Sequence, residues 1–98
     1  MTMPAQLSTD AVATIASGVL AQLGAPPRRI EVAPGEIDTG EKVLWVDAWY
    51  PTYSDIPPAR QRLLAGGQVW GGVELAGDSR LVLVNFRSET DEPVDLML

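Results

Sequence analysis

The strongest candidate for chemistry in this chain is Asp47, which lies midway between two tryptophans in the segment KVLWVDAWY, residues 42–50. Alternate residues of a β-strand share a face, so Trp45, Asp47 and Trp49 are expected on the same side. A carboxylate held between apolar rings needs a partner, or its pKa rises, and a raised pKa suits a general acid. No second carboxylate stands at a defined spacing, so the pair of carboxylates that a glycosidase uses is not indicated. The simpler interpretation is that Asp47 is an ordinary surface aspartate with hydrogen-bond partners.

The two tryptophans also suit protein recognition. Large aromatic side chains on an open sheet face are typical anchors of protein interfaces. The alternative is that the chain covers this face itself, for instance with its C-terminal VDLML, which would make both rings part of the core. We expect a protein-binding surface to which five residues contribute: Trp45, Asp47, Trp49, Tyr53 and Trp70.

The composition argues against several kinds of active site. The chain has no cysteine and no histidine, which removes thiolate chemistry, the commonest general base and the commonest zinc ligand. Its acids are too irregularly spaced for an EF-hand loop, and no glycine-rich phosphate-binding motif occurs. The sequence therefore predicts neither a metal site nor a cofactor, and it favours a protein that is not an enzyme.

A second unusual segment is GGQVWGG, residues 66–72, in which Trp70 lies between two glycine pairs. The simpler interpretation is that the first pair ends a helix and the second marks a bulge in the following strand. The functional alternative is that the flexible backbone lets a ligand approach or lets Trp70 move.

The first half of the chain predicts one helix and two strands. Apolar residues follow a helical spacing from Thr9 to Leu23, with Ser8 or Thr9 as the cap and Gly24 at the end. RRIEVA, residues 28–33, alternates like a half-buried strand, and residues 34–41 carry turn signals. Residues 42–50 then form a strand that is apolar on both faces.

The second half predicts a short helix and a hairpin. The helix PARQRLLA, residues 58–65, would pack on the sheet through Ala59, Leu63 and Leu64. A longer version through Trp70 is possible at about 1 kcal/mol for each internal glycine. Strands at 69–75 and 80–86 would follow, joined by the Gly-Asp turn of AGDS.

Together these elements predict an α+β fold in the order α-β-β-α-β-β, a two-layer open-faced sandwich. Four mostly antiparallel strands would carry both helices on one face. We expect one small domain over residues 1–98, with a lead-in of 7–8 residues and an acidic tail from about 88 to 98.

The net charge and the hydropathy of the chain limit the kinds of partner that we expect it to bind. Seven basic residues stand against 13 acidic ones, a net charge of −6 that repels nucleic acid and anionic membranes. No segment predicts a signal peptide or a membrane span, so a cytoplasmic site is expected. The sequence favours a protein-binding module, such as an immunity protein, an inhibitor or an adaptor. The alternatives are a subunit that self-assembles through the same face and a small enzyme with a carboxylate acid or base.

Overall fold

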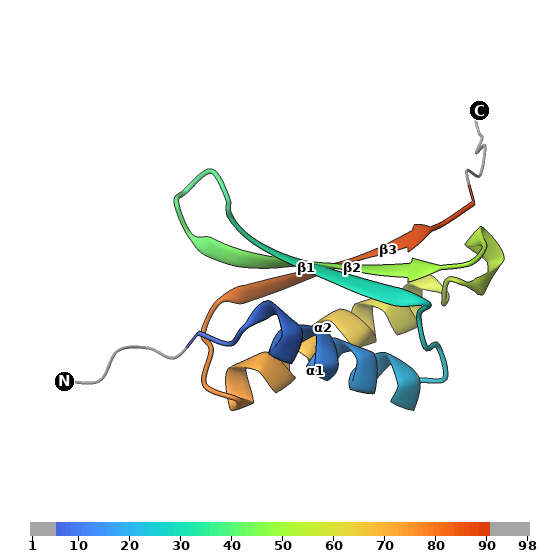
Figure 1. Ribbon diagram of the computed structural model, residues 1–98, viewed down its shortest axis with the longest axis horizontal. Coiled ribbons are helices and arrows are strands. Elements are labelled where there is room, and N and C mark those ends of the chain that lie inside the picture. The colour runs from blue at the N-terminus through green and yellow to red at the C-terminus, as the bar shows by residue number, and fades with distance from the viewer. Residues whose placement is uncertain (1–5, 91–98) are drawn as a thin grey trace.

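The computed structural model of the chain describes residues 6–90, which form two layers (Figure 1). One layer is a three-stranded sheet and the other is a pair of helices, α1 and α2, that pack on the same face of that sheet. In chain order the elements are α1 (Thr9–Gln22), β1 (Arg29–Glu36), β2 (Lys42–Tyr50), the 3-10 turn η1 (Tyr53–Asp55), α2 (Ala59–Leu75) and β3 (Leu81–Ser88).

The sheet is mixed, with β2 in the centre. β1 pairs with β2 antiparallel, and β3 pairs with the other edge of β2 in parallel. The α+β class and the placement of both helices on one face are therefore confirmed. The predicted fourth strand and the mostly antiparallel sheet are wrong for the described residues, whose order is α-β-β-α-β.

The first helix forms as its sequence predicts. The Ser8 hydroxyl accepts a hydrogen bond from the Ala11 amide at 3.1 Å, which satisfies one of the unpaired amides of the first turn. Val12, Ala16 and Leu20 are fully buried along one stripe. The helix ends at Gln22, and Gly24 just beyond it has a φ of +79°, a conformation that glycine adopts readily.

β1 extends further than the sequence predicted. Pro34 and Gly35 belong to the strand, and the turn is limited to residues 37–41, where the Ile37 amide donates to the Glu41 carbonyl at 3.1 Å. Because β1 is an edge strand, Pro34 can sit in it without removing a bond from the interior of the sheet.

The second helix differs most from the prediction. The strand expected at residues 69–75 is helical, and both glycine pairs of GGQVWGG lie inside α2 rather than at a helix end and a bulge. Ala65, Val69 and Val73 recur at helical spacing and are buried. Their burial stabilises the helix by more than the interior glycines cost, at about 1 kcal/mol each. Parallel strands also need a crossover between them, which α2 provides from β2 to β3.

The side of α2 that meets the sheet also differs from the prediction. Leu63 and Leu64, expected to pack against the sheet, are 81% and 49% exposed. Gly72 instead lies close to α1, since a Cβ at this position would come within 2.9 Å of the Ile15 Cγ2 atom.

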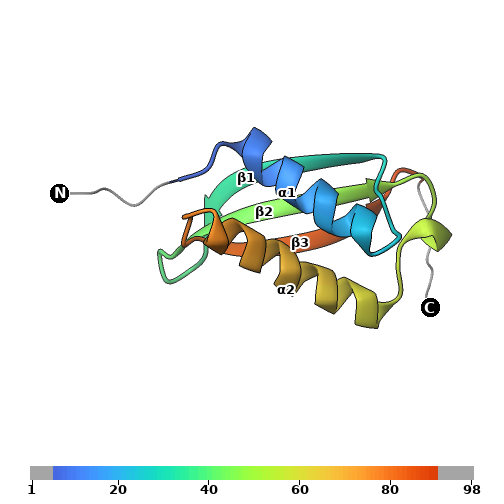
Figure 2. The ribbon, with the colours of Figure 1, turned by 90° about the horizontal axis from the view of Figure 1, so that it is seen from below.

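The core lies between the sheet and the two helices, which cross one face of the sheet in Figure 2. On β2, Leu44, Val46, Ala48 and Tyr50 face the helices and are buried. The Tyr50 hydroxyl donates to the Ala25 carbonyl at 2.7 Å, and burial raises the pKa of Tyr50 to about 12. β2 thus buries one complete face, as its alternation predicts.

The connection between α2 and β3 holds a buried ion pair. Asp78 is 1% exposed and accepts hydrogen bonds from the Leu7 amide at 2.9 Å and from Arg80 Nη2 at 2.6 Å. Arg80 Nη2 also donates to the Leu7 carbonyl. The Gly-Asp turn, which the sequence predicts to close a hairpin, therefore connects α2 to β3. Through Asp78 and Arg80 it also contacts the segment before α1.

Candidate functional site

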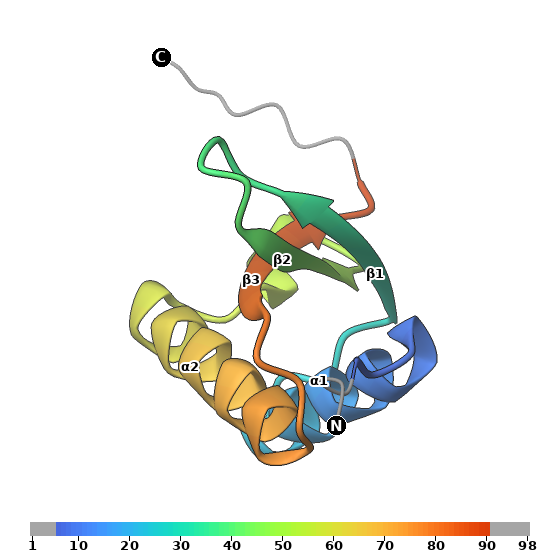
Figure 3. The same ribbon diagram turned by 90° about the vertical axis from the view of Figure 1, so that its left-hand side faces the viewer.

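The sheet face opposite α1 and α2, called the open face below, carries the first three predicted site residues. Viewed along the sheet, both helices lie on one side, and no described element covers the other (Figure 3). The predicted cover by VDLML falls outside the described residues. By register, the open face consists of Arg29, Glu31, Ala33 and Gly35 of β1, Val43, Trp45, Asp47 and Trp49 of β2, and Leu81, Leu83, Asn85 and Arg87 of β3.

One end of the open face is apolar and centres on Trp45. Its neighbours in register are Ala33 and Leu83, and its side chain is 37% exposed. The indole lies close over β1, because a Cβ at Gly35 would come within 2.7 Å of Trp45 Nε1. Val43, the next β2 residue on this face, is fully buried. Gly35 therefore leaves room for the Trp45 ring across the neighbouring strand.

The other end of the open face is polar and centres on Trp49. Trp49 Nε1 donates to a Glu31 carboxylate oxygen at 3.1 Å. The guanidinium carbon of Arg29 lies 4.4 Å from the centre of the Trp49 ring, and that of Arg87 lies 5.7 Å away, both within cation–π range. Trp49 is thus held by its own neighbours and offers less surface than Trp45.

Asp47 has partners on β3. It accepts a hydrogen bond from Asn85 Nδ2 at 3.1 Å and pairs with Arg87 Nε at 3.3 Å. Asp47 is therefore not an isolated carboxylate between two rings, and its contacts connect β2 with β3 on the open face. Within residues 6–90 there is no group of three potential metal-binding His, Cys, Asp or Glu side chains.

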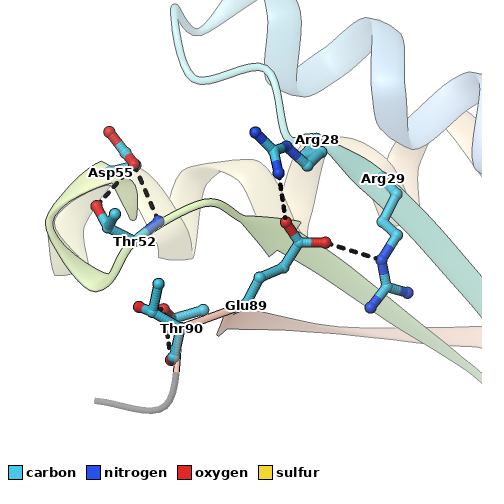
Figure 4. Close-up of polar contacts among 7 residues, drawn as sticks. Arg28, Arg29, Thr52, Asp55, Glu89 and Thr90 are labelled. Atoms are coloured by element: carbon cyan, nitrogen blue, oxygen red, sulfur yellow. Dashed lines mark hydrogen bonds and ion pairs between the residues drawn. The ribbon is translucent and has the colours of Figure 1, made fainter.

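Glu89 extends the polar end just beyond β3. Its carboxylate pairs with Arg28 at 3.3 Å and with Arg29 at 3.0 Å, and its amide donates to the Tyr50 carbonyl at 2.8 Å (Figure 4). The hydrogen bond that Arg29 Nε donates to Glu89 raises the pKa of Arg29. The arginines at this end are therefore matched by carboxylates of the same chain.

Tyr53 and Trp70 lie away from the open face. Tyr53, in η1, is 65% exposed and lines an open groove of about 560 Å³ together with residues of α2 and β3. The turn that carries it is closed by Thr52, whose hydroxyl donates to Asp55 at 2.7 Å (Figure 4). Trp70 projects from α2 and is 43% exposed. The five predicted residues therefore occupy three places rather than one surface.

The residues that surround the tryptophans are not predicted from the sequence. Glu31, Asn85 and Arg87 form the polar end with Asp47 and Trp49. The alternation in residues 28–33 already placed Arg29 and Glu31 on one side of a strand. Their position beside the tryptophans follows only from the strand register, which needs the fold.

Comparison of the chain with protein-family models, with curated proteins and with solved structures finds no match in any of the three. None of the helices in residues 6–90 is both long and apolar enough to cross a membrane.

Proposed function

We propose that this protein is a non-catalytic binding domain that holds a different protein on the apolar end of its open face. The observation that carries the proposal is the position of Trp45: more than a third of its side chain is exposed, beside Leu83, on a sheet face that no described element covers. Burying a large indole beside aliphatic neighbours is a common source of binding energy at interfaces.

The surrounding charge indicates the chemistry of the partner. The hairpin that follows β1 carries Asp38 and Glu41, neither of which has an ion-pair partner within residues 6–90. At the polar end, by contrast, arginines and carboxylates pair with one another. The unmatched negative charge thus borders the Trp45 end, which fits a partner with an apolar patch flanked by lysine or arginine. An immunity protein, an inhibitor or an adaptor would bind in this way.

Replacing Trp45 with Ser tests the proposal. Because the ring is partly exposed and lies over β1 rather than in the core, we expect the variant to stay folded and to lose at least tenfold in affinity. Tyr53→Ser is the matched control, since it removes an exposed aromatic ring that lies off the open face. The measurement is calorimetry of wild type and both variants with a partner recovered from the native host and purified.

Three outcomes contradict the proposal. Unfolding of Trp45→Ser would show that the ring belongs to the core. An equal loss of affinity in Trp45→Ser and Tyr53→Ser would show that binding does not use the open face. A wild-type oligomer that Trp45→Ser dissociates would support self-assembly through this face instead. The enzyme alternative predicts that Asp47→Asn abolishes a turnover while leaving stability nearly unchanged.

A further inference from the structure

The outward side of α2 carries an exposed stripe that the open face does not explain. Of the large hydrophobic residues that are exposed within residues 6–90, the majority lie on this one helix. Six of its exposed positions recur at i, i+3, i+4, i+7, i+10 and i+14, the spacing of a helix that packs along a second helix. We call these the α2 stripe: Arg60, Leu63, Leu64, Gly67, Trp70 and Glu74.

The α2 stripe is separate from the buried side of the helix. α2 contacts the sheet and α1 through Ala65, Val69, Val73 and Gly72. Figures 2 and 3 show α2 at the outer side of the helical layer, next to β3, with no other element on its far side. Leu63 and Trp70 are 81% and 43% exposed. The helix therefore has one face for its own core and a second, largely apolar face without a cover in the described structure.

Packing inside the chain does not account for the glycines of this face. A Cβ at Gly67 or Gly71 would meet no atom within 4 Å, whereas one at Gly72 would press on Ile15. Glycine in a helix interior is destabilising relative to alanine, so these two positions weaken α2 without relieving a contact. A glycine at the centre of a helix face does allow another backbone to approach closely.

The stripe is complementary to itself, and we propose that it binds the α2 stripe of a second copy in an antiparallel pair. A twofold axis beside Gly67 places residues equally distant before and after it opposite each other. Leu64 then faces the partner's Trp70, three residues from the axis on either side. Arg60 faces the partner's Glu74, seven residues from it on either side.

The charges identify a second copy as the occupant. Within residues 6–90 neither the Arg60 side chain nor the Glu74 side chain has an ion pair or a hydrogen bond. In the antiparallel pair, Arg60 of each copy lies opposite Glu74 of the other, so the twofold symmetry creates two ion pairs. A parallel arrangement of the two helices would instead place Arg60 beside the partner's Arg60 and Glu74 beside the partner's Glu74. The pairing leaves the open face of each copy accessible, so it is independent of the function proposed above.

Charge reversal tests the pairing. Light scattering and sedimentation of the whole protein should show a monomer–dimer equilibrium, and Arg60→Glu or Glu74→Arg should each weaken it at least tenfold. The double variant, Arg60→Glu with Glu74→Arg, should restore dimerisation, because the opposite charges face each other again. Arg60 and Glu74 are both exposed in the single copy and neither side chain has a partner there, so the variants should fold.

A cysteine placed at the axis gives a second test, because the chain contains no cysteine of its own. Packed helices lie 8–10 Å apart with a Cα radius near 2.3 Å, which brings facing Cα atoms to roughly 3.4–5.4 Å, a range whose upper part suits a disulfide. Gly67→Cys should therefore form a disulfide-linked dimer on oxidation. Gln61→Cys, which is exposed on α2 but outside the stripe, should not.

The proposal is overturned if the protein is a monomer at 100 μM, as an order-of-magnitude upper limit for a weak interface. It is equally overturned if the double variant fails to restore association or if Gln61→Cys crosslinks as well as Gly67→Cys. A dimer that is insensitive to Arg60→Glu but lost in Trp45→Ser would assign self-association to the open face. Loss of heterologous binding in Trp45→Ser leaves the pairing of α2 unaffected, so the two proposals fail separately.

Discussion

Asp78 shows how one buried residue can stabilise an open two-layer fold. Its carboxylate accepts hydrogen bonds from the Arg80 side chain, the Arg80 amide and the Leu7 amide, and it is almost fully buried. The hydrogen bond from the Arg80 side chain is the main reason that the pKa of Asp78 is lowered to about 2, against an opposing effect of burial. The ion pair therefore connects the segment before α1, the end of α2 and the start of β3.

This lowered pKa predicts an acid-dependent stability. A carboxylate with a lower pKa in the folded state stabilises the protein fully above its ordinary pKa near 4 and loses that contribution as the pH falls through about 2. Asp78→Asn should therefore lower the free energy of unfolding by about 2 kcal/mol at pH 7. The difference from wild type should shrink between pH 4 and pH 2. Urea titrations at each pH measure it.

Asp38→Asn is the matched control for Asp78→Asn, because Asp38 lies in the exposed hairpin and has no ion pair within residues 6–90. Surface changes of this kind alter stability by less than about 0.5 kcal/mol. A constant difference between Asp78→Asn and wild type from pH 7 to pH 2 would show that the charge of Asp78 is not what stabilises the turn.

Among the elements, α2 has glycines with two different roles, and substitution by alanine separates them. Gly66→Ala should stabilise the protein by about 1 kcal/mol, because it improves helix propensity and a Cβ there meets no atom. Gly72→Ala should not raise the free energy of unfolding, because the new Cβ presses on the stiff, β-branched Ile15. This variant should be at least about 1 kcal/mol less stable than Gly66→Ala. Thermal unfolding at low protein concentration measures both, and equal stabilisation would contradict the close contact between α1 and α2.

The same helix shows how far the sequence predicts the fold. Ser8, the stripe that follows it and Gly24 predict α1, and the alternation of residues 42–50 predicts the bounds of β2. The sequence predicts α2 too short because its two glycine pairs are typical of helix ends and strand bulges, although Ala65, Val69 and Val73 follow a helical spacing. Local glycine signals were outweighed by burial, which depends on tertiary contacts.

The candidate site was predictable only in part. Trp45 and Asp47 could be placed on one face from alternation alone. The partners of Asp47, Asn85 and Arg87, lie about forty residues further along the chain, on a strand that pairs in parallel. Nothing local specifies that register. Trp70 was grouped with the sheet face because its segment was taken for a strand, and its true position on α2 follows from the helix.

For the whole molecule, net charge and local charge have different consequences for the two proposed surfaces. The chain carries a net charge of −6, so its average field attracts a basic partner and repels a second copy. The α2 pairing must overcome that repulsion through burial of Leu63, Leu64 and Trp70 and through two local ion pairs. The open face gains from the same field during encounter.

Salt should therefore act in opposite directions on the two interactions. Raising the ionic strength from about 0.1 M to 1 M shortens the screening length from roughly 10 Å to 3 Å. The association rate of a basic partner at the open face should fall several-fold, since steering is lost. Dimerisation through α2 should hold or strengthen, because repulsion between two acidic copies is screened more than the short Arg60 to Glu74 contacts are. Stopped-flow binding and sedimentation across the same salt series measure both. A dimer that dissociates as the salt concentration rises, as the complex with the basic partner does, would show that the Arg60 to Glu74 ion pairs contribute more to the pairing than the burial of Leu63, Leu64 and Trp70.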